Sequence, residues 1–240
     1  MFTENELEKI KDQSYQDREV KTDLLEGSNF ISEMYNKQYK LQKLMKDKGR
    51  TLLLPDITKD QEDVNEDTVA LSIYHFFCMQ TEEEELKQEL RRCRELVDCT
   101  KEVEYELIDI AFFLFNVGIY SGINIEKVLN SDYPWYDYEQ DEIWTIEQLI
   151  SMLNSSVINF IDKLPWKSWR TYNLTKWHEE DRFRSNIFML YATCINDYLK
   201  LSWRILTSHH NNFENYLYGL YCNKWQENWD RQFDKNKGYV

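Results

Sequence analysis

The stretch from Ile110 to Ile123, "IAFFLFNVGIYSGI", carries no charged residue on any face of a helix. A helix on the surface of a globular protein keeps one polar side, so a helix that is apolar all round is surrounded by neighbours. The sequence therefore predicts a central helix over about 101–121, packed inside a bundle of other helices. Gly118 and Gly122 are expected to help end it.

The rest of the chain also favours helices. Only 6 Gly and 3 Pro occur among 240 residues, so patterns typical of strand, turn and strand are scarce. Leu, Glu, Lys and Gln recur at helical spacing instead. We expect an all-α multi-helix bundle, with further helices at 4–25, 29–49, 66–93, 125–130, 146–164, 181–207 and 213–232.

Two regions suggest a division of the chain. Residues 1–27 are predicted to form a charged N-terminal helix, and residues 28–240 a main all-α domain. The segment near 132–144, "DYPWYDYEQDEIW", is both acidic and aromatic. Such a connector is the best candidate for a boundary or a mobile loop within the main domain.

The charge of the chain excludes several classes of partner. With 29 basic and 43 acidic side chains the formal net charge is -14, which repels nucleic acids and anionic lipid surfaces. No stretch reaches the roughly 18 to 20 apolar residues that span a bilayer. The five cysteines show no CxxC pairing and are typical of reduced thiols. We expect a cytoplasmic protein with no membrane partner and no direct nucleic-acid binding.

Two acidic residues precede the apolar stretch, Glu106 and Asp109. Because they are three residues apart, they lie on the same face of the helix. If that face is buried, the two like charges raise at least one pKa unless a counter-charge is bound, and oxygen ligands of this kind suit Mg²⁺. Alternatively, both lie on solvated first turns, where the helix dipole stabilises them. The spacing alone leaves both interpretations open.

Three segments resemble a known family. "YELIDIAFFLFNVGI" is similar to the ExxD helix motif of the dimeric all-α dUTPases and phage dCTPases, relatives of the MazG-type nucleoside triphosphate pyrophosphohydrolases. "YCNKWQENWDRQFDKNKGY" resembles the signature near the C-terminus of that family, and "QYKLQ" resembles its Gln-x-x-Leu-Asn element. The resemblance implies Glu106 and Asp109 as metal ligands. The substrate-binding residues that it implies are Gln38, Gln42, Lys224, Asn228, Arg231 and Tyr239.

The family also has an ExxE pair on the preceding helix, and two alignments compete for it. Counting from Gln38 puts Ser72 and His75 at these positions. A shifted alignment puts Glu82 and Glu85 there instead, and these two would then be the catalytic carboxylates. The spacing from Gln38 fits Ser72 and His75 better, since the shifted alignment needs a longer preceding segment and a shorter following one. The residue types fit Glu82 and Glu85 better, but "TEEEEL" is equally typical of a solvated charged face.

A later segment, "LPWKSWR" at 164–170, is similar to a tryptophan-rich element that the family has directly after ExxE. Its place in the chain indicates either coincidence or an old internal repeat. In the second case Ser156 and Asn159 would stand where the repeat once had carboxylates.

The resemblance implies a Mg²⁺-dependent pyrophosphohydrolase that converts dUTP or dCTP to the nucleoside monophosphate and pyrophosphate, working as a homodimer. Phosphoryl chemistry of this kind needs carboxylates to hold the cation and basic residues to hold the phosphates. The alternative is a hydrolase-derived module, phage-encoded like some relatives, that binds a nucleotide or a partner protein without hydrolysis. The sequence leaves open whether the chain is an enzyme.

Overall fold

The computed structural model describes residues 29–51, 53–59, 63–95, 101–131, 144–164, 181–206 and 211–233. Within these ranges it contains seven α-helices and no strand, which confirms the all-α bundle. The helices are α2 (Phe30–Asp47), α3 (Glu66–Glu95), α4 (Lys101–Tyr120), α5 (Ile125–Leu129), α6 (Ile146–Lys163), α8 (Asp181–Ile205) and α9 (Phe213–Phe233). The predicted helix at 4–25 and nearly all of the connector near 132–144 lie outside the described residues.

Polar side chains fix where several helices begin. Asn29 accepts hydrogen bonds from the first backbone amides of α2, and Asn124 does the same for α5. Thr145 and Gln148 form the predicted capping box of α6, in which each side chain bonds to the backbone of the other. Each cap satisfies amides that have no partner within the helix. These caps explain why the predicted starts agree with the observed ones.

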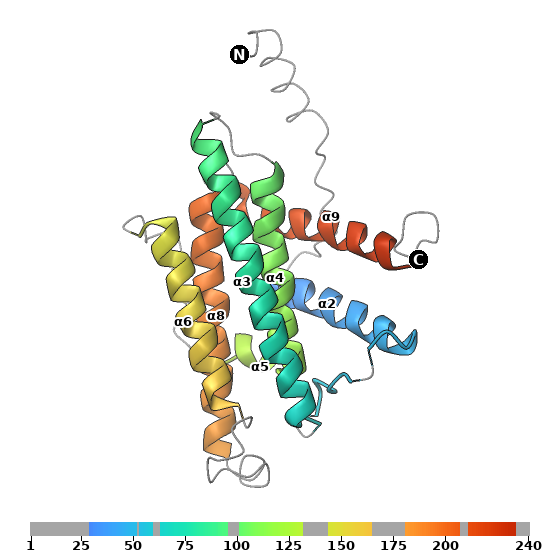
Figure 1. Ribbon diagram of the computed structural model, residues 1–240. Coiled ribbons are helices and arrows are strands. Elements are labelled where there is room, and N and C mark those ends of the chain that lie inside the picture. The colour runs from blue at the N-terminus through green and yellow to red at the C-terminus, as the bar shows by residue number, and fades with distance from the viewer. Residues whose placement is uncertain are drawn as a thin grey trace.

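Four long helices form two antiparallel pairs (Figure 1). In the first pair, Ser72 of α3 donates its hydroxyl to the carbonyl of Val117 of α4 at 3.2 Å. In the second, α6 packs on α8, where the rings of Phe160 and Tyr191 lie 5.2 Å apart. Hydrogen bonds and packing across these seams therefore hold each pair together over most of its length.

Helix α4 is the centre of the bundle, as its sequence predicts. From Ile110 to Tyr120 every residue but Phe113 is buried. Three buried tyrosines, one from α2 and two from α8, donate their hydroxyls to backbone carbonyls along α4 or just after its C-terminal end. Tyr35 bonds to Ile123 at 2.8 Å, Tyr191 to Leu114 at 3.0 Å and Tyr198 to Leu107 at 3.3 Å. Each buried hydroxyl thereby keeps a partner in an apolar core.

The structure corrects the role expected for Gly118. Gly122 has a φ of +66° and follows the helix end, but Gly118 lies inside α4. A Cβ built on Gly118 would come within 2.4 Å of the ring and the hydroxyl of Tyr191. Gly118 is therefore needed for packing, because it lets α8 approach the backbone of α4, and the positive φ that ends the helix belongs to Gly122.

Helices α2 and α9 lie together on one side of the two pairs and run in the same direction (Figure 1). The indole Nε1 of Trp225 on α9 donates to the backbone carbonyl of Lys37 on α2 at 3.1 Å. Both helices also contact α4. This arrangement places side chains of the last helix beside the first turns of the central one.

None of the helices in the described parts of the chain has the length and apolar character needed to cross a membrane.

Candidate functional site

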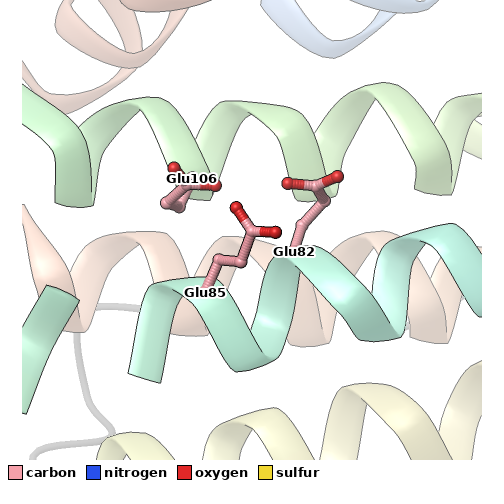
Figure 2. A group of neighbouring side chains, drawn as sticks. All are labelled: Glu82, Glu85 and Glu106. Carbon is pink, nitrogen blue, oxygen red and sulfur yellow. The ribbon is translucent and has the colours of Figure 1, made fainter. Parts of the chain in front are cut away.

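An acidic cluster forms where the C-terminal half of α3 passes the first turns of α4. Glu82 and Glu85 are one turn apart on α3, and both point toward Glu106 of α4 (Figure 2). One carboxylate oxygen from each of the three lies within 4.8 Å of one from each of the others. Because adjacent ligands of an octahedral Mg²⁺ are roughly 3 Å apart and opposite ones about 4 Å, small side-chain movements would close these oxygens around one ion.

The pKa shifts in the cluster come mainly from burial and from repulsion between its acidic groups. Burial, followed by repulsion from Asp109 and Glu85, raises the pKa of Glu82 to about 8. Burial and the nearby Asp109 also raise the pKa of Glu106, and a hydrogen bond from Glu82 partly opposes this. A bound cation would reverse these shifts, since it favours the ionised carboxylates.

Asp109 has a different environment from the three glutamates. Its Oδ2 lies 2.8 Å from the Nζ of Lys224 on α9. Burial raises the pKa of Asp109, while the charges of Lys224 and Arg231 lower it. Lys224 is only 7% exposed, and its Nζ also lies 4.6 Å from the ring centroid of Tyr105. The fourth carboxylate of the site is thus already paired with a buried cation from the protein.

Two tyrosines form hydrogen bonds between α9 and the start of α4, and these bonds help to position Lys224. The Tyr105 hydroxyl donates to Glu227 at 2.8 Å, and the Tyr216 hydroxyl donates to Glu104 at 2.7 Å. Sequence reasoning missed Tyr105 and Glu227. The only sequence signal for Tyr105 is its place directly before Glu106, which does not reveal that its ring faces α9.

The structure distinguishes the two alignments of the second carboxylate pair by position. Ser72 is fully buried and lies 2.9 Å from the hydroxyl of Ser121, two or more turns of α3 away from the cluster. The ring of His75 stacks on Tyr120 at 5.1 Å, and burial lowers the pKa of His75 to about 4. Glu82 and Glu85 are therefore the residues of α3 that meet Glu106, whereas Ser72 and His75 lie further along the same seam.

The two glutamines predicted to bind substrate are buried and bonded within the protein. Gln38 donates to the Oδ1 of Asn116 at 2.9 Å and accepts from Tyr221 at 3.4 Å. Gln42 accepts from the hydroxyl of Tyr120 at 3.0 Å. Both amides thus belong to a polar layer that begins nearly three helical turns from Glu106, a separation of roughly 15 Å along α4.

The remaining predicted residues lie on or beyond α9. Asn228 is half-buried one turn after Lys224. Arg231 is exposed, 3.8 Å from Glu227, and close enough to Asp109 to affect its pKa. Tyr239 lies outside the described residues.

A buried carboxylate that sequence reasoning also missed lies on the opposite face of α3. Glu83 is 1% exposed and accepts a hydrogen bond from Asn154 of α6, and among the described residues its second oxygen has no hydrogen-bond partner. Burial raises the pKa of Glu83 to about 7. The run of four glutamates therefore divides between two faces, with Glu82 and Glu85 toward α4 and Glu83 toward α6.

Comparisons with known proteins give no family: no family model, no curated protein and no solved structure matches this chain. The chemistry of the site is therefore argued from its own residues. An all-oxygen set of three glutamates fits a hard divalent cation such as Mg²⁺ and does not fit a metal that prefers sulfur or imidazole.

Proposed function

We propose that the protein is a Mg²⁺-dependent pyrophosphohydrolase of a pyrimidine deoxynucleoside triphosphate, dUTP or dCTP. The observation that carries the proposal is the meeting of two consecutive helices with a third, α9, whose Lys224 follows Glu106 by more than 100 residues in the sequence. Glu82 and Glu85 of α3 face Glu106 of α4, and Lys224 of α9 reaches the same place. A cation site beside a buried lysine is what binding of a metal-complexed triphosphate requires.

Each residue has a role in this proposal that follows from its position. Glu82 and Glu106 hold the cation, because both are half-buried and point into the seam. Glu85 is the most exposed of the three and is the residue best placed to accept a proton from a water that enters from solvent. When bound, the cation neutralises phosphate charge and makes a coordinated water more acidic.

Two basic residues complete the proposed substrate site. Lys224 supplies a point charge for the phosphates, and Arg231, on the same helix two turns later, supplies a second one. They give local positive charge to a protein whose net charge of -14 would otherwise repel a triphosphate. The proposal keeps Asn228 as a candidate for contact with the base.

Pyrophosphate release from a panel of deoxynucleoside triphosphates, with and without Mg²⁺, tests the function. We expect turnover of dUTP or dCTP that needs Mg²⁺ and disappears in Asp109→Ala. Glu102→Ala is the matched control, since Glu102 is an exposed acid on the same helix, one turn before Glu106. No release from any substrate in the panel would contradict the proposal. Light scattering on the same samples tests the homodimer that the resemblance implies.

One observation favours the second candidate, a binding module without turnover. Asp109 is held by Lys224 at 2.8 Å, so the site already contains a positive charge of its own. A nucleotide that raises the melting temperature while no pyrophosphate appears would support this candidate. The same panel therefore separates the two functions.

A further inference from the structure

The buried ion pair between Lys224 and Asp109 divides the four carboxylates into two groups. Oxygens of Glu82, Glu85 and Glu106 converge within 4.8 Å, whereas Asp109 is bonded to an ammonium group at 2.8 Å. Lys224 is 7% exposed, so water does little to screen its charge. The protein thus offers one open position for a cation and one that its own lysine already fills.

A divalent cation next to Asp109 would have to remove this lysine. Two positive charges cannot share one carboxylate oxygen at contact distance without strong repulsion in a poorly solvated place. The Lys224 ammonium has somewhere to go, because its flexible stem allows the head group to move while the carbons stay packed. A phosphate group is the kind of anion that would attract it.

We propose that Lys224 is an internal counter-ion that occupies the second cation position of the site. It thereby makes the two divalent cations bind in a fixed order. One divalent cation binds at the glutamate cluster, held by Glu82 and Glu106, in the absence of any anion. A second reaches Asp109 only after a phosphate-bearing ligand has drawn Lys224 away. This inference rests on the proposed function for its first cation, and adds that the second one depends on the ligand.

Counting bound Mn²⁺ by equilibrium dialysis of the full chain tests the first half. Mn²⁺ shares the preference of Mg²⁺ for oxygen ligands. We expect one ion per wild-type chain and two per Lys224→Met chain, because methionine keeps the apolar stem and removes the charge. Lys101→Met is the matched control: the Nζ of Lys101 lies 4.5 Å from the same Tyr105 ring, but Lys101 is exposed. It should still bind one ion.

A double variant checks where the additional ion binds. Adding Asp109→Asn to Lys224→Met should return the count to one. Two ions in the wild type without an anion, or one in Lys224→Met, would overturn the inference while leaving the metal-binding part of the proposed function standing. No ion in any variant would overturn both.

The second half is tested without the Lys224 variant, so it does not depend on the folding of that variant. Wild type and Asp109→Asn are dialysed against Mn²⁺ and a non-hydrolysable dUTP analogue. Metal carried by the nucleotide is the same for the wild type and the variant. The difference between their numbers of bound ions therefore gives the ion at Asp109. We expect one more ion in the wild type than in Asp109→Asn. Equal counts would overturn the ordered loading.

Discussion

The acidic residues between the helices of the two antiparallel pairs have opposite surroundings. In the α6–α8 pair, Asp197 is 5% exposed and accepts a hydrogen bond from Ser156. Burial raises the pKa of Asp197, but Ser156 and Lys200 oppose this. In the α3–α4 pair, the three glutamates face mainly one another. The carboxylate of the first kind has a hydroxyl partner in the core, whereas the second kind is a group of like charges that a bound cation would stabilise.

This contrast bears on the internal repeat suggested by the sequence. Ser156 contacts the acid of the neighbouring helix, much as Glu82 does in the other pair. Asn159 is exposed and lies away from that contact. A single hydroxyl opposite a single carboxylate binds no cation, because it offers too few charged oxygens. The α6–α8 pair therefore resembles the candidate site in layout and differs from it in chemistry.

The largest effect is expected on the rate of pyrophosphate release when the α3–α4 pair loses one acid, compared with the same change in the α6–α8 pair. Glu106→Gln removes a cation ligand, and we expect it to lower the rate of pyrophosphate release at least about 100-fold. Asp197→Asn is the matched change in the other pair and should leave the rate unchanged. Steady-state kinetics with dUTP and dCTP at saturating Mg²⁺ make the measurement. Equal losses in both variants would mean that the two pairs do not differ in function.

A smaller effect is expected on stability from breaking the contact in the α6–α8 pair. Ser156→Ala leaves the buried Asp197 without its hydroxyl partner, at a cost of about 1 to 3 kcal/mol in the free energy of unfolding. Ser155→Ala is the control, because Ser155 is exposed and donates its hydroxyl to the carbonyl of Ser151 in its own helix. Urea unfolding followed by circular dichroism compares the two. A similar change in both variants would show that the contact with Asp197 adds nothing.

The smallest effect is expected in how the stability of the protein depends on pH. The part of this dependence that comes from the α3–α4 pair should disappear when Mg²⁺ is added. The pKa of Glu82 is about 8 in the folded protein and about 4.5 ordinarily, so the folded state keeps a proton that the unfolded state has released between these values. Stability without metal therefore falls as the pH rises through this window. Melting temperatures between pH 5 and 8, with Mg²⁺ or with EDTA, measure the slope.

Two variants identify the source of that slope. Glu82→Gln should make the metal-free slope shallower, and Glu83, whose pKa is raised to about 7, should account for part of what is left. Asp197→Asn should change the slope less, since Ser156 and Lys200 oppose the shift in the pKa of Asp197. A melting temperature that rises with pH in EDTA would contradict this interpretation.

Much of the fold could be predicted because its signals are local. Caps such as Thr145 with Gln148, and the uncharged run from Ile110, act within one helix and can be read from neighbouring residues. The same periodicity places Glu106 and Asp109 on one face of α4, although it left open whether that face is buried or solvated. Local patterns therefore predicted the helices and the pairing of the two acids that form one half of the candidate site.

The other half depends on how helices are aligned with one another. Whether Ser72 and His75 or Glu82 and Glu85 meet Glu106 is decided by the alignment of α3 against α4, which hydrogen bonds such as that of Ser72 with Ser121 fix across 49 residues of sequence. The role of Gly118 was wrong for the same reason, since Tyr191 is 73 residues away. Contacts of this range leave no periodic trace in either segment.

Gly118 also links the two pairs mechanically. Because the Tyr191 ring occupies the volume that a side chain at this position would need, α8 rests directly on the backbone of the helix that carries Glu106 and Asp109. A displacement of α8 would therefore be transmitted to the cation ligands about two to three turns away along a rigid helix. The spacing of the acidic cluster therefore depends on how the α6–α8 pair packs against α4.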